Sequence, residues 1–92
     1  MPITFSNSNP ANGDRVTVTA TGPSDHNISN VELTVTGAIS GGGRGNTQAA
    51  FGDTIDNNNT FATIHAYAVY TNADTDPTTE LTEKDSVPVQ VP

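Results

Sequence analysis

Alternation of apolar and polar side chains is the dominant pattern along the chain. Residues 15–22 read RVTVTATG and residues 30–37 read NVELTVTG, so that valine, alanine and leucine alternate with threonine and glutamate. Successive side chains of a β-strand point to opposite faces, and this pattern therefore predicts two half-buried strands. The positions expected to face the core are Val16, Val18, Ala20, Val31, Leu33 and Val35.

The longest strand candidate, residues 60–72 (TFATIHAYAVYTN), is apolar on both faces. One face carries Ala62, Ile64, Ala66, Ala68 and Tyr70, and the other carries Phe61, Thr63, His65, Tyr67 and Val69. A central strand that is covered on both sides has such a composition, so we expect the second face to belong to the core as well. The alternative is an exposed aromatic patch formed by Phe61, His65 and Tyr67, which would mark a protein contact.

Three further segments complete the predicted set of strands: residues 3–6, 48–52 and 86–92. The last of these contains Pro88 and Pro92, which cannot donate to a ladder, so we expect that it lies at a sheet edge or bends there. Segments rich in Gly, Asn, Asp and Pro separate the strands, as turns require. These turn segments are residues 9–14, 22–29, 39–46, 52–60 and 72–80. About seven antiparallel strands without a helix signal predict an all-β sandwich, formed by residues 1–92 as one domain.

The order of these elements resembles bacterial and bacteriophage immunoglobulin-like domains. In residues 9–37, a proline and a glycine turn precede a Val-Thr strand, and Ile28 stands three residues before Val31 at the entry to the next strand. Residues 64–74 and 86–92 are similar to the penultimate strand, the Asp-rich turn and the closing valine strand of that group. The resemblance implies a single immunoglobulin-like β-sandwich. The chain has no Cys and no Trp, so the core of antibody domains is not implied.

Charge and composition narrow the classes of partner. The chain has 92 residues with 3 Lys/Arg against 10 Asp/Glu, a net charge of −7. Nucleic-acid binding depends on neutralising phosphates, and anionic membranes attract basic segments, so we expect neither partner. No apolar run has the length of a membrane-spanning helix. The N-terminal segment lacks the basic and apolar regions of a secretory signal, which favours a protein that stays where it is made or a module of a larger chain.

The glycine-rich segment GAISGGGRGNT, residues 37–47, invites comparison with phosphate-binding loops. It lacks the lysine of a P-loop, and no helix follows whose N-terminus could hold a phosphate. We interpret residues 39–46 as a hairpin tip that is either flexible or ordered against a partner. Arg44, together with Asn46, is then a candidate contact, because a guanidinium suits a carboxylate on a neighbouring protein.

Candidate metal ligands and catalytic groups are few. Asn72, Asp74, Asp76 and Glu83 have spacing similar to a calcium loop, but Pro77 stands where that loop needs glycine. A solvated turn is therefore the favoured interpretation. The two histidines, His26 and His65, have no partners at metal or catalytic spacing, so we expect no enzyme activity and no cofactor.

The function that combines these expectations is that of a structural, protein-binding component. A decoration (cement) protein of a bacteriophage head is favoured, made in the host cytoplasm and docked in the virion on capsid or other virion subunits, with self-association an open alternative. The alternative function is an extracellular, non-catalytic accessory module of a secreted bacterial adhesin or carbohydrate-active enzyme. Strand edges at residues 3–6 and 86–92 would extend a neighbour's sheet. The contact residues would be Arg44, Asn46, Phe61, His65 and Tyr67 with the turn at 22–29.

Overall fold

The computed structural model describes residues 3–56 and 62–90, and within these ranges the chain forms seven β-strands. They are β1 (Ile3–Phe5), β2 (Arg15–Thr21), β3 (Ile28–Gly37), β4 (Gly41–Gly45), β5 (Gln48–Thr54), β6 (Thr63–Asn72) and β7 (Thr79–Pro88). The described ranges contain no helix that is long and apolar enough to cross a membrane. The prediction of an all-β chain with about seven antiparallel strands is confirmed.

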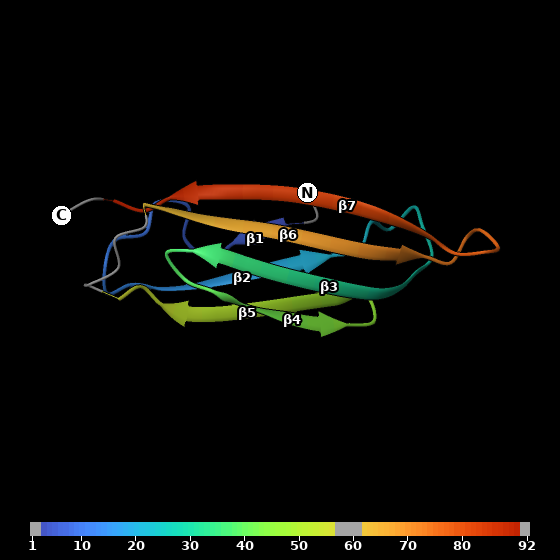
Figure 1. Ribbon diagram of the computed structural model, residues 1–92, viewed down its shortest axis with the longest axis horizontal. Helices are drawn as coiled ribbons and strands as arrows, with labels where there is room; N and C mark the ends of the chain where they lie inside the picture. Colours follow the sequence, from blue (N-terminus) through green and yellow to red (C-terminus); the bar gives the residue numbers. More distant parts are fainter. Residues whose placement is uncertain (1–2, 57–61, 91–92) are drawn as a thin grey trace.

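Two sheets face each other in an elongated molecule of 49 × 18 × 15 Å (Figure 1). One sheet has the order β1-β2-β5 and the other the order β4-β3-β6-β7, and all paired neighbours are antiparallel. At one end of the sandwich, backbone hydrogen bonds tie residues 22–27 to the connections at 46–47 and 73–78, through Gly22 N to Thr47 O and Ala73 N to Asn27 O. We call these three segments the turn end.

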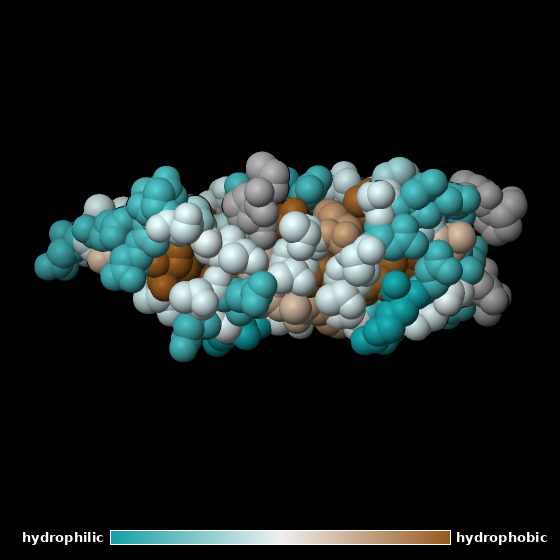
Figure 2. All heavy atoms as spheres, turned by 180° about the vertical axis from the view of Figure 1, so that it is seen from behind, coloured by the Kyte–Doolittle hydropathy of each residue, from teal (hydrophilic) through white to brown (hydrophobic). Residues whose placement is uncertain are grey.

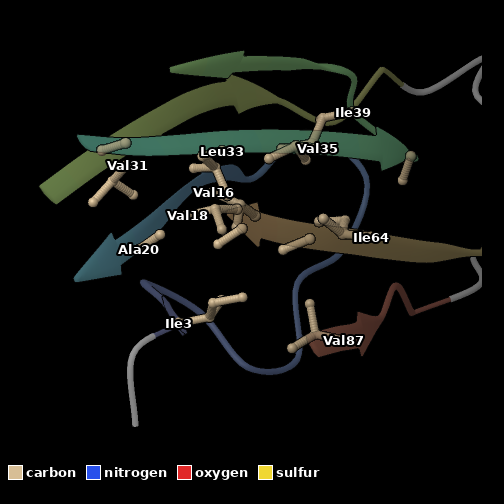
Figure 3. Packing of buried hydrophobic residues seen from close by; sticks show 14 of the residues in the cluster. Ile3, Val16, Val18, Ala20, Val31, Leu33, Val35, Ile39, Ile64 and Val87 are labelled. Atoms are coloured by element: carbon tan, nitrogen blue, oxygen red, sulfur yellow. The ribbon is translucent and has the colours of Figure 1, made fainter. Parts of the chain in front are cut away.

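Apolar side chains from both sheets point toward one another and form the core (Figure 3). The six core positions predicted for β2 and β3 are each at most 3% exposed. Ile64 and Val87 add to this core from β6 and β7, and Ile39 from the connection after β3. β-Branched side chains suit this arrangement, because they pack well on a pleated, half-buried surface. The alternation in the sequence thus identified the core of β2 and β3 correctly.

The molecular surface is dominated by polar side chains where β1 and β2 face outward. Figure 2, which views the protein from behind Figure 1, shows pale and hydrophilic side chains over most of this side, with small hydrophobic areas between them. The turn end forms a hydrophilic projection at the left of that view (Figure 2).

Strand β6 is central in its sheet, as predicted, but it is covered on one face only. Ile64, Ala66, Ala68 and Tyr70 are buried against the other sheet, with Tyr70 1% exposed. On the opposite face His65 and Tyr67 are exposed. The expectation that both faces belong to the core is wrong, because no third layer of described residues covers the outer side of this four-stranded sheet. The outer face of β6 instead matches the alternative expectation, an exposed face that carries His65 and Tyr67.

The glycine segment is an edge strand and not a hairpin tip. Residues 41–45 form β4, which pairs with β3, and the turns lie on either side of it. Gly43 and Gly45 face β5 of the other sheet so closely that a Cβ at Gly43 would overlap the carbonyl oxygen of Ala50, and one at Gly45 that of Gln48. Only a strand without side chains on that face permits this approach of two backbones. The glycines therefore bring the two sheets together, which corrects the interpretation of residues 39–46 as a projecting loop.

Strand β7 is an edge strand, as Pro88 indicated, but it begins earlier than residue 86. All ten of its residues pair with β6, from Thr79 opposite Asn72 to Pro88 opposite Thr63. Beyond its end, Val89 N donates to Ala62 O and Gln90 N donates to Pro10 O. The turn expected at 72–80 is thus shorter, and of the predicted strand at 86–92, residues 86–88 are the end of a longer strand, while residues 91–92 lie outside the described residues.

Candidate interaction surface

The side of the β4-β3-β6-β7 sheet that points away from the core, here called the outer face, brings together several predicted contact residues. Thr34, Tyr67 and Lys84 lie side by side across β3, β6 and β7. Tyr67 is 38% exposed, and Lys84 Nζ lies 5.7 Å from the centre of its ring, within the range of a cation–π interaction. The Lys84 ammonium thus lies over the Tyr67 ring, and the tyrosine stays partly accessible.

A shallow groove of about 660 Å³ surrounds this pair. Its lining includes Thr34, Thr36, His65, Tyr67, Lys84 and Ser86. The next row of the sheet, in which His65 lies between Thr36 and Ser86, extends the groove along β6. The groove therefore combines two aromatic rings (Tyr67 and His65), one cation and several hydroxyl groups, which can take up both apolar and hydrogen-bonding groups of a partner.

Arg44 lies on the same outer face. Its row of paired residues, which continues through Glu32 to Val69, is next to the row that contains Tyr67. Arg44 is the register partner of Glu32 on β3, and the two side chains form an ion pair. Glu32 in turn is the register partner of Val69 on β6. The carboxylate that the sequence assigned to a neighbouring protein is thus supplied by this chain itself, because strand pairing sets two residues that are far apart in sequence opposite one another. The Arg44 side chain is still 72% exposed, so its guanidinium can donate to a second partner.

The outer face is close to neutral, whereas the whole chain carries a charge of −7. Among the described residues, two basic and two acidic side chains lie on it: Arg44, Lys84, Glu32 and Glu80. Two of the three basic residues of the chain are thus found on this single face, and Arg15 lies on β2 of the other sheet. The acidic excess is consequently distributed over the rest of the molecule.

The remaining predicted contact residues lie elsewhere. Asn46 is exposed in the two-residue connection between β4 and β5, at the turn end. Phe61 lies outside the described residues. The predicted contact edges at residues 3–6 and 86–92 correspond to β1 and the end of β7, both of which are edge strands. The role of all these residues in partner contact stays a prediction.

The residues considered for calcium serve the turn end instead. Asn72 Oδ1 accepts a hydrogen bond from Asp74 N, and both Asp74 oxygens are engaged, by Asn27 N and by His26 Nδ1 (each 3.1 Å). Glu83 is four residues along β7 from the partner of Asn72, roughly 13 Å away at the rise of a strand. Asp76 is exposed. In residues 3–56 and 62–90 no three acidic or histidine side chains are grouped to hold a metal ion.

Two features of the turn end had no signal in the sequence. The contact of His26 with Asp74 joins two turns that are 48 residues apart. Tyr70 is buried on the inner side of β6, and its hydroxyl group has no hydrogen-bond partner among the described residues. Burial, with a smaller contribution from the charge of Glu83, raises the pKa of Tyr70 to about 12. Alternation identified Tyr70 as a core residue but could not show where its hydroxyl group would lie.

The chain matches no protein-family model, and a search of curated proteins returned no match. The functional conclusion therefore depends on the residues and the geometry described above.

Proposed function

We propose that this chain is a non-catalytic structural protein that docks on another protein through its outer face, and that it decorates the head of a bacteriophage. The observation that carries the proposal is the exposed Tyr67, which lies under the Lys84 ammonium in a groove lined with hydroxyl groups. Tyrosine and arginine are enriched among residues that dominate binding energy, and Arg44 lies one row away on the same face.

The strand order supports an immunoglobulin-like assignment. In immunoglobulin domains, strands A, B and E belong to one sheet and C, F and G to the other, and in variable-type domains strand C′ joins the second sheet. Here β1, β2 and β5 form one sheet, while β3, β6 and β7 form the other with β4 beside β3. This order agrees with the resemblance that the sequence has to bacterial and bacteriophage immunoglobulin-like domains. A fold hosts many functions, so the docking role depends on the outer face itself.

The distribution of charge over the molecule indicates which side of the protein would face its partner. The nearly neutral outer face can approach a protein surface, while the acidic remainder stays in water and keeps bound copies apart by repulsion. In this proposal the partner is the capsid shell, and the protein is found in the virion. Binding stabilises both components by mass action, which suits a protein whose function is to reinforce a shell.

Co-sedimentation with undecorated capsids tests the proposal. The wild-type protein should bind and raise the resistance of the capsids to heat, and Tyr67→Ala should weaken binding by about tenfold or more, since interface tyrosines often contribute 2 kcal/mol or more. Lys84→Glu should weaken binding similarly. Arg15→Glu, the same charge reversal on the opposite sheet, is the matched control and should bind as the wild type does. Absence of binding by a folded wild-type protein would exclude capsid decoration, and equal loss in Arg15→Glu would exclude the outer face as the contact.

A further inference from the structure

A second concave site lies at the turn end, away from the outer face. It has a volume of about 300 Å³ and is formed where residues 22–27 meet the inner side of β6 and β7. Its lining includes Pro23, Asp25, His26, Tyr70, Leu81 and Glu83. Apolar walls, a phenol and two carboxylates therefore converge from three separate segments of the chain.

The feature of this site that indicates a ligand is the hydroxyl group of Tyr70. Tyr70 is 1% exposed, and its hydroxyl has no hydrogen-bond partner among the described residues. Buried polar groups in native proteins are nearly always hydrogen-bonded, because leaving one unsatisfied is unfavourable. Glu83 lies near enough for its charge to act on the Tyr70 hydroxyl, and both residues line this site. The Tyr70 hydroxyl itself is closed to solvent, so a group that enters the site meets the carboxylate of Glu83 first and reaches the phenol oxygen by displacing the side chains that cover it.

The rim of the site is held in place by hydrogen bonds between the two neighbouring turns. Asp74 accepts from the backbone of Asn27 and from the His26 ring, and Ala73 N donates to Asn27 O (2.8 Å). His26 Nε2 also lies 4.0 Å from Asp25 Oδ2. These contacts order the segment that carries Asp25 and His26, so the acidic rim is formed before any partner arrives, which reduces the entropy that binding must overcome.

We propose that this site binds an alkylammonium group, the side chain of a lysine on a partner protein. The methylene chain packs between Pro23 and Leu81, and the ammonium donates to the Tyr70 hydroxyl oxygen and to the carboxylates of Glu83 and Asp25. An ammonium with three rotatable donors suits acceptors that come from three segments better than the planar fork of arginine does. The inference depends on the proposed docking function only for the source of the lysine, because the site itself is separate from the outer face.

Amide chemical-shift titration of the nitrogen-labelled protein, with capped lysine (Nα-acetyl-lysine methylamide) as the probe, tests the proposal. Capped norleucine, which keeps the methylenes and lacks the ammonium, is the matched control ligand. Saturable shifts at Leu81, Glu83 and His26 are expected with the lysine probe alone. Glu83→Gln should weaken the response about tenfold, as expected for loss of a charge-assisted hydrogen bond.

Tyr70→Phe separates the site from the fold. It removes an unsatisfied hydroxyl, so the urea midpoint should be unchanged or higher, while affinity for the lysine probe falls several-fold. Tyr67→Phe, the matched variant three residues away on the outer face, should change neither quantity. Equal shifts with norleucine, tighter binding of spermidine than of lysine, or a Tyr70→Phe variant that is destabilised with unchanged binding would each overturn the assignment. Failure of capsid binding leaves this titration unaffected, so the two proposals can fail separately.

Discussion

Strands β4 and β7 both form an edge of the four-stranded sheet, yet they have no residue type in common. Four of the five residues of β4 are glycine, whereas β7 is ten residues long and carries Glu80, Glu83, Lys84 and Asp85. One side of β4 lies in backbone contact with β5 of the other sheet. The outer edge of β7 is paired with no strand in the described part of the chain.

The difference shows two solutions to the same problem, the exposed backbone of a sheet edge. At β4, the absence of side chains allows the opposing sheet to approach, so that the sandwich is closed there. At β7, Glu83 and Asp85 are register partners of the buried Ala68 and Ala66, which puts charge on the side where a partner strand would bring apolar groups. Inward-pointing charges and proline are known to discourage edge-to-edge pairing. Each edge can therefore be tested with substitutions that leave the other intact.

Gly43→Val is expected to have the largest effect. Valine favours strands by intrinsic propensity, by up to about 1 kcal/mol, so a simple edge strand would be stabilised. Because a Cβ at Gly43 would overlap the Ala50 carbonyl oxygen, we expect a destabilisation of about 3 kcal/mol or more, measured as a lower urea midpoint.

Ser86→Val on the exposed side of β7 is the matched control, with an expected change within about 0.5 kcal/mol. The two variants make the same kind of addition to the two edges. An unchanged midpoint for Gly43→Val would mean that β4 is not in contact with β5 and that its glycines serve a loop.

These edges also mark the limit of what the sequence could predict about the fold. Alternation identified the core positions of β2, β3 and the inner side of β6, since one buried face per strand produces a period of two. Gly43 and Gly45 were assigned to a projecting turn because a glycine run has the same composition in a flexible tip and in a strand that contacts another backbone. The start of β7 at Thr79 was missed because Glu83 and Asp85 interrupt the apolar face that Leu81 and Val87 continue.

Glu83→Thr combined with Asp85→Thr tests the other edge, with a smaller effect on stability and a larger one on association. We expect the free energy of unfolding to change by no more than about 1 kcal/mol. The variant should self-associate at concentrations where the wild type is monodisperse, because the edge no longer repels a second strand. Sedimentation velocity over a range of concentrations measures this.

Loss of two negative charges by itself favours association, so the control must lose the same charge. Asp25→Asn combined with Asp76→Asn removes two exposed carboxylates from the turns. Association of both variants to the same extent would attribute the effect to net charge and would leave β7 without a protective role.

Several residues of the candidate surface could be identified from the sequence, but their arrangement on one face could not. His65 and Tyr67 were recognised from the second apolar face of residues 60–72, and Arg44 from its rarity in an acidic chain. Their position on one outer face follows from the pairing of β3 with both β4 and β6, which no local pattern encodes. The unsatisfied Tyr70 hydroxyl could not be foreseen either, because it depends on how residues 22–27 pack against the first half of β7.

The smallest expected effect concerns the Arg44–Glu32 pair, the one charged contact that links β4 to its sheet in the described residues. Both side chains are well exposed, at 72% and 46%, so water screens their attraction. In a double-mutant cycle of Arg44→Ala and Glu32→Ala, we expect a coupling energy of about 0.5 kcal/mol that falls as salt is added. A coupling above about 2 kcal/mol, insensitive to salt, would show that β4 is held by this pair and not by its glycine contact with β5.

Since the Arg44 guanidinium can donate to a further partner, the Arg44→Ala single variant should weaken capsid binding more than it changes the urea midpoint. The reverse result would remove Arg44 from the docking surface.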